Sequence, residues 1–198
     1  LSIANTVIHD HEKTGWMTFA QMIQKSSNIG AAKVGMALGE WRVFDYLKDF
    51  GFGDKTGIDL PGEAVGLLRG PRQWGKRSLA SISMGQEVGV TPLQMVTAVS
   101  AIANGGVLMK PFVVSEIRNA KGQLVAQTMP QAKRRVISAD TARTLTTLME
   151  GVVTNGTGGK AAIPGFRVAG KTGTAQKVDP RTGAYSSTLL VGSFLGYV

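Results

Sequence analysis

Apolar residues recur at helical spacing along the first part of the chain. From Thr18 the stretch TFAQMIQK predicts a short helix with Thr18 as its N-cap, and the pattern resumes in IGAAKVGMAL after an interruption at SSN. The serine pair is therefore expected at a joint between two helices. A further helix is predicted over residues 40–50, ended by Gly51, with an apolar face made of Val43, Phe44, Leu47 and Phe50.

The stretch after Thr91 predicts a helix that is apolar on almost every side. Thr91 is its expected N-cap, Pro92 occupies the first helical position, and Gly105 ends it. Because no side of this helix is clearly polar, we expect it to be buried in a larger core. Another helix is predicted over residues 138–153.

Strand-like stretches fill the regions between and after these helices. Residues 107–117 and 123–129 predict two strands around the turn NAKG. In the last third, residues 166–178 and 185–198 predict two strands around the turn DPRTG. Strands joined by so short a turn must be antiparallel neighbours, so we expect helices combined with antiparallel strands.

Composition narrows the classes of protein to which the chain can belong. With 198 residues, 43% of them apolar and 18% charged, it is long enough for one domain or part of a larger one. No stretch is apolar for long enough to span a bilayer, and the first residues lack a signal-peptide pattern. The absence of cysteine excludes disulfides, thiolate catalysis and zinc sites built on cysteine.

The net charge of +9 favours an anionic partner such as nucleic acid, lipid head groups or an acidic polymer. The basic residues are scattered, apart from clusters at residues 69–77 and 133–135, and no alternation of basic and aromatic residues of the RNA-binding kind is present. We interpret the two clusters as solvated faces and expect no nucleic-acid partner.

The stretch GFRVAGKT fits the phosphate-binding loop pattern, but its flanks do not. Such a loop needs a buried strand before it and a helix after it, whereas here TGGKAAIP precedes it and Pro180 follows closely. The same lysine opens one of three Lys-Thr-Gly tripeptides, at residues 13–15, 55–57 and 171–173. The first two are predicted to lie in turns, and only the third on a strand.

On a strand, Thr172 and Thr174 lie on one face and Lys171 on the other, while Gly173 has no side chain to obstruct a ligand. Two hydroxyls beside an ammonium suit a carboxylate ligand. The alternative is an exposed polar edge strand that limits aggregation. These residues alone leave both interpretations open.

Ser26 and Asn28 add a second candidate group, about 145 residues before Lys171. At a joint between helices, a hydroxyl and a carboxamide can point together into a cleft, where they relay a proton and orient a carbonyl. The alternative is a simple helix cap. Ser-x-Asn followed by Lys-Thr-Gly is far more specific than either motif alone.

Six segments carry a resemblance to a known family. In this order, SSNIGAAKVG, GFGDKTGIDLPGE, SMGQEVGVTPLQM, AIANGGVLMKP, GTGGKAAIPGFRVAGKTGTAQK and TLLVGSFLGYV resemble the transpeptidase domain of class B penicillin-binding proteins. The resemblance implies an α/β (α+β) fold of the penicillin-binding protein and serine β-lactamase type, an antiparallel sheet with a helical subdomain. It assigns residues 1–198 to a partial transpeptidase domain.

The resemblance also implies a function and residue roles. The parent would be a serine-type D,D-transpeptidase that needs no cofactor or metal, cross-links peptidoglycan stem peptides through an acyl-serine and binds β-lactams. Ser26 would pass a proton to the leaving amine, Asn28 would hold the substrate amide, and Lys171 would supply positive potential. The ligand carboxylate would be bound by Thr172, Gly173 and Thr174, and the Thr174 N–H would be an oxyanion donor.

The nucleophile of that family is not among these residues. It is the serine of Ser-x-x-Lys, and no serine of this chain has a lysine three residues later. In the family this motif precedes Ser-x-Asn by about fifty to sixty residues, which would fall before Leu1. We therefore expect a fragment that also lacks the family's last strand and helix and is not acylated by itself.

The resemblance implies a location and partners too. We expect the extracytoplasmic face of the bacterial inner membrane, an anchor outside this sequence, and division or elongation proteins as partners of the parent. Rival interpretations are a D,D-carboxypeptidase or β-lactamase of the same fold, or a non-catalytic domain that binds peptidoglycan or a partner. A metal site at His9 and His11 is less favoured than a polar turn, and no Gly-x-Ser-x-Gly supports a Ser-His-Asp triad.

Overall fold

The computed structural model of the protein describes residues 1–13 and 15–198, with every side chain in these ranges except that of Ser187. The first Lys-Thr-Gly tripeptide includes Thr14, so the turn predicted there lies outside the described residues. Within the described ranges, every helix is too short or too polar to cross a bilayer.

The chain divides into two compact units. The first consists of Leu1–Phe44, Arg69–Val88 and Thr144–Val198, and the second of Asp45–Leu68 and Gly89–Arg143. Each unit brings together segments that are distant in the sequence, so residues far apart along the chain can line one site within a unit.

The helical joint predicted in the first unit is present. Helix α1 (Phe19–Gln24) begins at the N-cap Thr18, in a capping box with Gln21, and helix α2 (Asn28–Leu38) begins at the N-cap Ser27. Each capping hydroxyl accepts a hydrogen bond from a free N–H of the first turn, which fixes where the helix starts. The predicted N-cap and the predicted joint are therefore confirmed.

Helix α2 packs closely on helix α4 (Ser78–Ser83). Gly35 makes this possible, because a Cβ at this position would overlap the Ser83 side chain. Ala32 and Ala80 are buried in the same part of the unit. The shorter elements of the first unit are β1 (Ser2–Ile3), β2 (Thr6–Val7) and the 3-10 helices Pro71–Gln73 and Gly159–Ala161.

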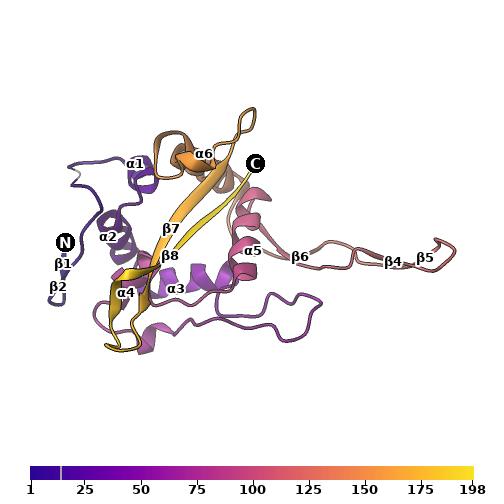
Figure 1. Cartoon of the computed structure of the whole chain (residues 1–198), viewed down its shortest axis with the longest axis horizontal. Helices are drawn as coiled ribbons and strands as arrows, with labels where there is room; N and C mark the ends of the chain where they lie inside the picture. Colours follow the sequence, from indigo (N-terminus) through magenta and orange to yellow (C-terminus); the bar gives the residue numbers. More distant parts are fainter. Residues whose placement is uncertain (14) are drawn as a thin grey trace. The chain divides into compact units, whose positions relative to one another are not determined.

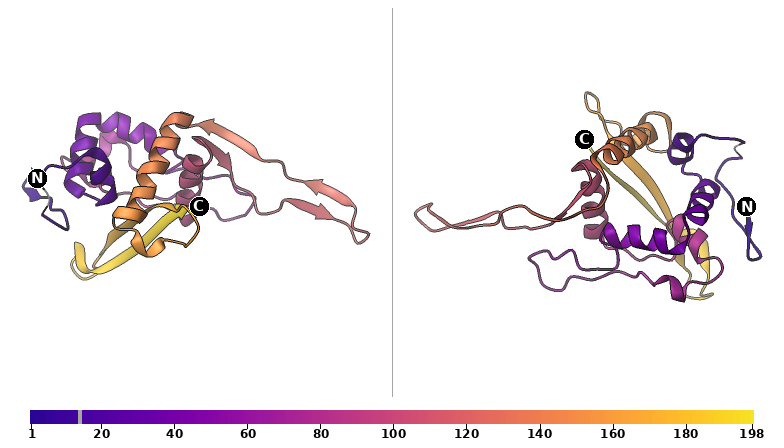
Figure 2. Two further views of the ribbon diagram at one scale, coloured as in Figure 1. Left: turned by 90° about the horizontal axis from the view of Figure 1, so that it is seen from above. Right: turned by 180° about the vertical axis from the view of Figure 1, so that it is seen from behind.

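The two strands predicted in the last third form an antiparallel pair. Strand β7 (Ala169–Val178) lies beside β8 (Tyr185–Tyr197), with Lys171 opposite Leu195 (Figures 1 and 2). The pair is confirmed, although β7 starts three residues after the start that its pattern indicated. Helix α6 (Ala139–Asn155) is joined to β8 by hydroxyl groups of Thr146 and Tyr197 that lie 2.7 Å apart.

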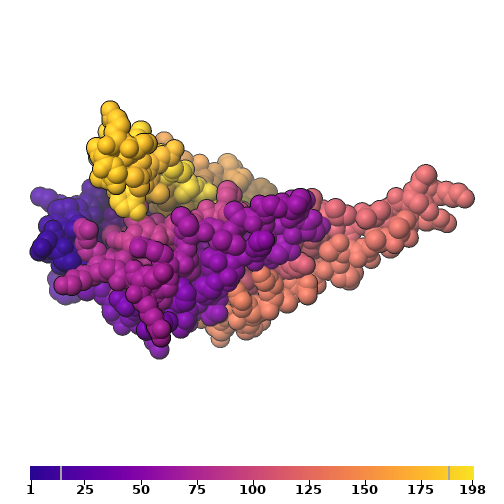
Figure 3. All heavy atoms as spheres, turned by 90° about the horizontal axis from the view of Figure 1, so that it is seen from below, coloured from indigo at the N-terminus to yellow at the C-terminus, as the bar shows by residue number. Residues whose placement is uncertain are grey.

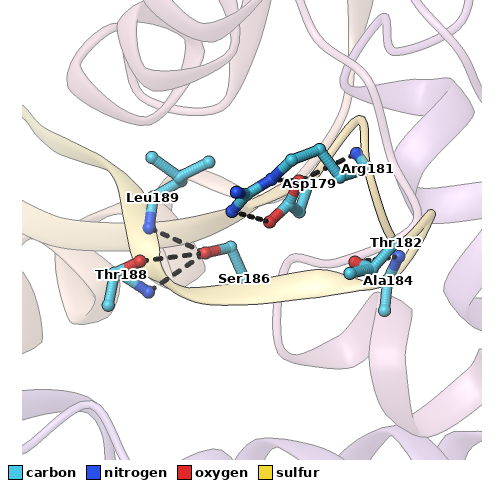
Figure 4. Close-up of polar contacts among 7 residues, drawn as sticks. All are labelled: Asp179, Arg181, Thr182, Ala184, Ser186, Thr188 and Leu189. Atoms are coloured by element: carbon cyan, nitrogen blue, oxygen red, sulfur yellow. Dashed lines mark hydrogen bonds and ion pairs between the residues drawn. The ribbon is translucent and has the colours of Figure 1, made fainter.

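The turn between β7 and β8 is closed by its own polar side chains (Figure 4). Asp179 Oδ1 accepts a hydrogen bond from Arg181 N at 2.9 Å, and the same carboxylate contacts the Arg181 guanidinium, which lowers the pKa of Asp179. At the start of β8, Ser186 Oγ accepts hydrogen bonds from the backbone N–H groups of Thr188 and Leu189. The predicted turn DPRTG is therefore present and built from local contacts.

In the second unit, helix α5 (Pro92–Ala103) has the predicted N-cap and start, and the predicted burial on one face. Val96 is 52% exposed, whereas Gln94 is 1% exposed. Gln94 Nε2 donates to two backbone oxygens, of Asp54 and Val65, at 2.8 and 2.9 Å. The predicted burial is confirmed for the face that carries Gln94, Ala98 and Ala101 and wrong for the face that carries Val96. The two hydrogen bonds of Gln94 determine which face of this apolar helix points inward.

The region predicted as one strand over residues 107–117 contains two. Strand β3 (Val107–Lys110) pairs with β6 (Gln131–Arg135), and β4 (Glu116–Arg118) pairs with β5 (Leu124–Gln127). Strand β6 was not predicted, and its residues are all exposed. Side-chain alternation cannot reveal a strand that is covered on neither face.

The cluster at residues 133–135 is exposed, as expected, but each of its cations also has a structural contact. Lys133 donates to the backbone oxygen of Thr56 at 3.1 Å, and Arg134 donates to that of Asp49 at 2.8 Å, at the end of helix α3 (Glu40–Asp49). Arg135 donates to that of Gly105 at 2.8 Å. These cations satisfy carbonyl groups at the ends of helices and in a turn, which stabilises the second unit.

The β4–β5 hairpin of the second unit is a narrow arm around the predicted turn at residues 119–122 (Figures 2 and 3). Asn119 Oδ1 accepts hydrogen bonds from two backbone N–H groups of this turn. Ile117 and Val125 are more than half exposed. The turn prediction is confirmed, and the arm adds little to the buried core of this unit, which includes Ala98, Ala101 and Leu108.

Candidate active site

Ser26 lies at the joint between α1 and α2 in an unusual backbone conformation. Its φ angle is +54°, in the left-handed region that residues with a side chain rarely adopt. The Ser26 N–H donates to the oxygen of Ile23, and the next N–H donates to that of Met22, which closes a tight turn after α1. The turn leaves the Ser26 side chain exposed at the end of the helix.

Lys171, at the start of β7, points at this serine. Its Nζ donates a hydrogen bond to Ser26 Oγ at 2.6 Å and another to the backbone oxygen of Thr172 at 2.9 Å. Burial lowers the pKa of Lys171, because the charged ammonium loses water contacts. Among the described residues, no carboxylate accepts a hydrogen bond from this ammonium. The structure therefore joins the Ser-x-Asn and Lys-Thr-Gly motifs through a direct contact.

The motifs share one cleft of about 960 Å³ in the first unit. Asn28 lies in its wall, and the carboxamide Nδ2 donates to the backbone oxygen of His9 at 3.3 Å. Its amide oxygen takes part in no hydrogen bond within the described residues, so it can accept one from a ligand. The cleft is also lined by Ser26, Ser83, Thr157, Lys171, Thr172, Gly173 and Thr174. All six candidate site residues are therefore in one place.

Asp10 stabilises the Ser-x-Asn segment through two hydrogen bonds, and this role was not predicted from the sequence. Its Oδ2 accepts a hydrogen bond from Ser27 Oγ at 2.8 Å, and its Oδ1 accepts one from the Ile29 N–H at 2.9 Å. A carboxylate at a helix N-terminus is also favoured by the helix dipole. The helix-cap role proposed for this motif thus belongs to Ser27, and Ser26 and Asn28 are left to line the cleft.

The segment around Asp10 is not arranged as a metal site. His9 contributes its backbone oxygen to Asn28, and Asp10 is used by α2. In the part of the chain that the structure describes, no three His, Cys, Asp or Glu side chains gather closely enough to hold a metal ion.

Thr157 is a second residue that sequence analysis missed. Its Oγ1 lies 2.5 Å from Thr172 Oγ1, and its backbone N–H donates to the oxygen of Gln24 at 3.2 Å. The stretch TNGTGGK indicates only a glycine-rich loop. The residues that Thr157 contacts lie on α1 and β7, outside this stretch of the sequence, so no local pattern reveals its role. Only the folded arrangement assigns it to the cleft.

The second Lys-Thr-Gly tripeptide, in the second unit, is built differently. Thr56 is 6% exposed, and its N–H and Oγ1 donate to Glu63 Oε1 at 2.6 and 2.5 Å. The Gly57 N–H donates to Glu63 Oε2 at 3.0 Å. The tripeptide lies in a loop, as predicted, and its donors already hold a carboxylate of the same chain.

Comparison with known proteins gives the same assignment as this geometry. Residues 2–198 match the sequence profile of the family described as the penicillin binding protein transpeptidase domain. The chain belongs to the penicillin-binding protein transpeptidase family. The resemblance stated from six segments of the sequence is therefore confirmed across almost the whole chain.

Curated members of this transpeptidase family are similar over most of the chain but are much longer. Stage V sporulation protein D of Bacillus subtilis is 44% identical over 184 residues, which cover 92% of this chain and 28% of that protein. Penicillin-binding protein PbpB of Mycobacterium tuberculosis is 34% identical over 205 residues, covering 99% of this chain and 30% of that protein. The chain thus spans less than a third of the length of these relatives.

A solved structure of a penicillin-binding protein confirms the fold. Penicillin-binding protein 3 of Mycobacterium tuberculosis, complexed with aztreonam, matches with a TM-score of 0.91 and 35% identity, covering 99% of this chain and 46% of that one. The predicted fold class, a penicillin-binding protein and serine β-lactamase-like fold with helices and antiparallel strands, is confirmed.

Proposed function

We propose that this chain forms the substrate cleft of a serine-type peptidoglycan D,D-transpeptidase, which cross-links stem peptides through an acyl-serine and is blocked by β-lactams. The observation that carries the proposal is the 2.6 Å hydrogen bond from Lys171 Nζ to Ser26 Oγ. It joins two motifs of different chemistry in one cleft, and membership of the transpeptidase family supports the same reaction.

Ser26 and Lys171 form the proton-handling part of the proposed site. The Lys171 ammonium lies against Ser26 Oγ, so the serine can give its proton to the leaving amine while the ammonium stabilises the negative charge that develops on oxygen. The amide of Asn28, with its oxygen unused, would orient the substrate carboxamide. These roles need a hydroxyl, a cation and an amide around one cleft, which is the set found here.

The start of β7 forms the proposed carboxylate-binding part. The hydroxyls of Thr172 and Thr174 and the nearby Lys171 ammonium suit the terminal carboxylate of a stem peptide or of a β-lactam. Gly173 lets the ligand backbone come close to the strand. The Thr174 N–H would donate to the oxyanion of the tetrahedral intermediate, a contact worth about 3 kcal/mol in a transition state.

The acyl step belongs to a serine with its own activating base. Residues 1–198 contain no Ser-x-x-Lys, so the groups described here bind the substrate, orient it and transfer protons. This observation favours a second candidate function for the chain by itself, the binding of peptidoglycan peptides without acyl transfer.

The location and the partners follow from the proposed substrate. Because peptidoglycan lies outside the cytoplasmic membrane, we propose that the protein works on the extracytoplasmic side, anchored by a segment outside this sequence. There it would associate with proteins of division or elongation. A cationic surface, with a net charge of +9 over the chain, is compatible with an anionic cell-wall environment.

Titration of the chain with a peptide ending in D-alanyl-D-alanine, followed by NMR, tests the proposal. We expect shifts at Ser26, Asn28 and Thr172, and Lys171→Ala should weaken binding about ten- to hundredfold, because a charged hydrogen-bond donor is lost. Lys55→Ala is the matched control, since it removes the same residue from the other tripeptide. Equal weakening in both variants, or binding that neither changes, would contradict the proposed site.

A further inference from the structure

Thr157 is fixed in place before any ligand arrives. Its N–H is bonded to the oxygen of Gln24, and the following Gly158 N–H donates to the oxygen of Val152 at 2.9 Å. Gly156 lies so close to α1 that a Cβ there would overlap the Gln24 oxygen. The turn is thereby attached to the end of α1, two residues before Ser26.

The Thr157 hydroxyl meets only one side chain of the predicted site. Its Oγ1 lies 2.5 Å from Thr172 Oγ1, and either oxygen can be the donor in the ligand-free protein. A threonine hydroxyl has one proton to donate and two lone pairs to accept with. If Thr172 donates to Thr157, no Thr172 proton remains for a ligand. If Thr157 donates, the Thr172 proton is free to point into the cleft.

A carboxylate ligand accepts hydrogen bonds and donates none, so it can be bound by Thr172 only in the second arrangement. The chain of donors would then run from Thr157 through Thr172 to the ligand, and each hydrogen bond polarises the next. The backbone side of Thr172 is also held, because its oxygen accepts from Lys171 Nζ at 2.9 Å. The backbone of Thr172 is therefore fixed, and the direction of its O–H bond depends on whether Thr157 donates to it or accepts from it.

We propose that Thr157 is a positioning residue for the carboxylate site, which donates to Thr172 Oγ1 and directs the Thr172 proton toward an anionic ligand. The proposal rests on the proposed function for the nature of the ligand. It predicts that Thr157 contributes to the preference for ligands with a free carboxylate over ligands in which that group is an uncharged amide.

The first test needs no ligand. Three-bond couplings of the Thr172 hydroxyl proton, measured by NMR, report the rotamer populations of its O–H bond, and thus the direction in which the proton points. Thr157→Val has a similar shape without the hydroxyl, and at an exposed position it should leave the fold intact. We expect one dominant Thr172 rotamer in the wild-type chain and in Thr157→Ser, and mixed rotamers in Thr157→Val. An unchanged Thr172 rotamer in Thr157→Val would overturn the proposal.

The second test compares a peptide ending in D-alanyl-D-alanine with its C-terminal amide. Thr157→Val should weaken binding of the free acid roughly threefold to tenfold and leave the amide unchanged, because one neutral hydrogen bond is removed. Equal loss for both ligands would overturn the positioning role. Failure of the wild-type chain to bind either ligand would sink the proposed function, whereas the rotamer measurement would still decide the role of Thr157.

Discussion

The tripeptides at residues 55–57 and 171–173 have the same sequence but differ in the groups that their donors contact. In the loop of the second unit, Thr56 and Gly57 donate to Glu63, and Thr56 is buried. On β7, Thr172 lines a cleft and its hydroxyl contacts another hydroxyl. The Thr56 and Gly57 donors of the loop tripeptide are bonded to a carboxylate of the same chain, whereas the donors of the strand tripeptide contact no carboxylate within the described residues.

The difference shows what makes such a motif a binding site. A threonine hydroxyl and adjacent N–H groups are suited to a carboxylate wherever they occur, in a loop or on a strand. If the chain supplies that carboxylate, as Glu63 does, the donors stabilise the fold. If it does not, they are available to a ligand. Among several identical motifs, the one whose donors are not bonded to a carboxylate of the same chain is therefore the better candidate for a binding site.

Removal of the two threonine hydroxyls should separate these roles and produce the largest effect. Thr56→Val leaves part of the Glu63 carboxylate without its donor and should lower the free energy of unfolding by about 2 kcal/mol. Thr172→Val should change it by less than about 1 kcal/mol. Denaturant unfolding measures both. In peptide titrations the order should reverse, with Thr172→Val impaired and Thr56→Val near wild type.

Glu63→Gln is the matched control for this comparison, since it keeps the shape of the side chain and removes its charge. It should destabilise the chain as Thr56→Val does, and the double variant should lose much less than the sum, because both changes break the same contact. If Thr172→Val proved the more destabilising change, or Thr56→Val the more damaging to binding, the distinction between the tripeptides would be wrong.

A smaller loss of stability is expected from substitution of Asp10, which stabilises the Ser-x-Asn segment that contacts Lys171. Asp10→Ala removes the acceptor of Ser27 Oγ and of the Ile29 N–H at the start of α2, and should cost about 1 kcal/mol of stability. It should also weaken peptide binding, because Asn28 lies in the same turn. Thermal unfolding and titration measure the two effects.

Glu12→Ala is a suitable control for Asp10→Ala. It removes the same charge from the wall of the same cleft, and Glu12 makes no side-chain hydrogen bond within the described residues. It should leave stability within about 0.5 kcal/mol. Equal effects of the two variants would mean that local charge, and not the cap on α2, accounts for the result.

The smallest expected effects are two rises of stability with pH, one in acid that depends on Glu63 and one in alkali that depends on Lys171. Burial tends to raise the pKa of Glu63, but hydrogen bonds from Thr56 and Gly57 outweigh it and hold the pKa below the ordinary 4.5. Its stabilisation is present above the pKa of the unfolded chain and is lost as pH falls through the folded-state pKa. Glu63→Gln should remove this loss in acid unfolding curves.

Lys171 should act at the alkaline end. Burial holds its pKa below the ordinary 10.5, so the unfolded chain binds more protons than the folded chain between these two values. The free energy of unfolding should therefore rise with pH across that window. Below the window Lys171 is charged in the folded chain, and burial of the ammonium destabilises the fold by its full amount. Lys171→Met should flatten the rise in urea unfolding measured across the window. A rise that persists in this variant would assign the effect to another group.

Local signals in the sequence predicted the elements that depend on neighbours in the chain. Thr18 and Thr91 are N-caps because their hydroxyls bond to N–H groups a few residues later, and the turn after β7 is closed by residues within it. The contact of Ser26 with Lys171 crosses 145 residues. Only the order of two motifs, through the family resemblance, indicated that these residues belong together.

What the sequence could not indicate depends on partners far along the chain. Gln94 is buried because of two carbonyl groups that no pattern around it reveals. Asp10 lies in a polar stretch and Thr157 in a glycine-rich one, and each has a role only because another segment folds against it. The strand β6 was missed because its polar side chains carry no alternation.

The left-handed backbone of Ser26 places two opposing demands on one position. The backbone geometry alone favours glycine or asparagine, and a β-branched residue would be strained there, so threonine, which keeps the hydroxyl, is not a conservative replacement. Only the hydroxyl that meets Lys171 favours serine. Replacements at this position are therefore narrowly limited, because the backbone conformation is compatible with few side chains and the contact with Lys171 requires a hydroxyl.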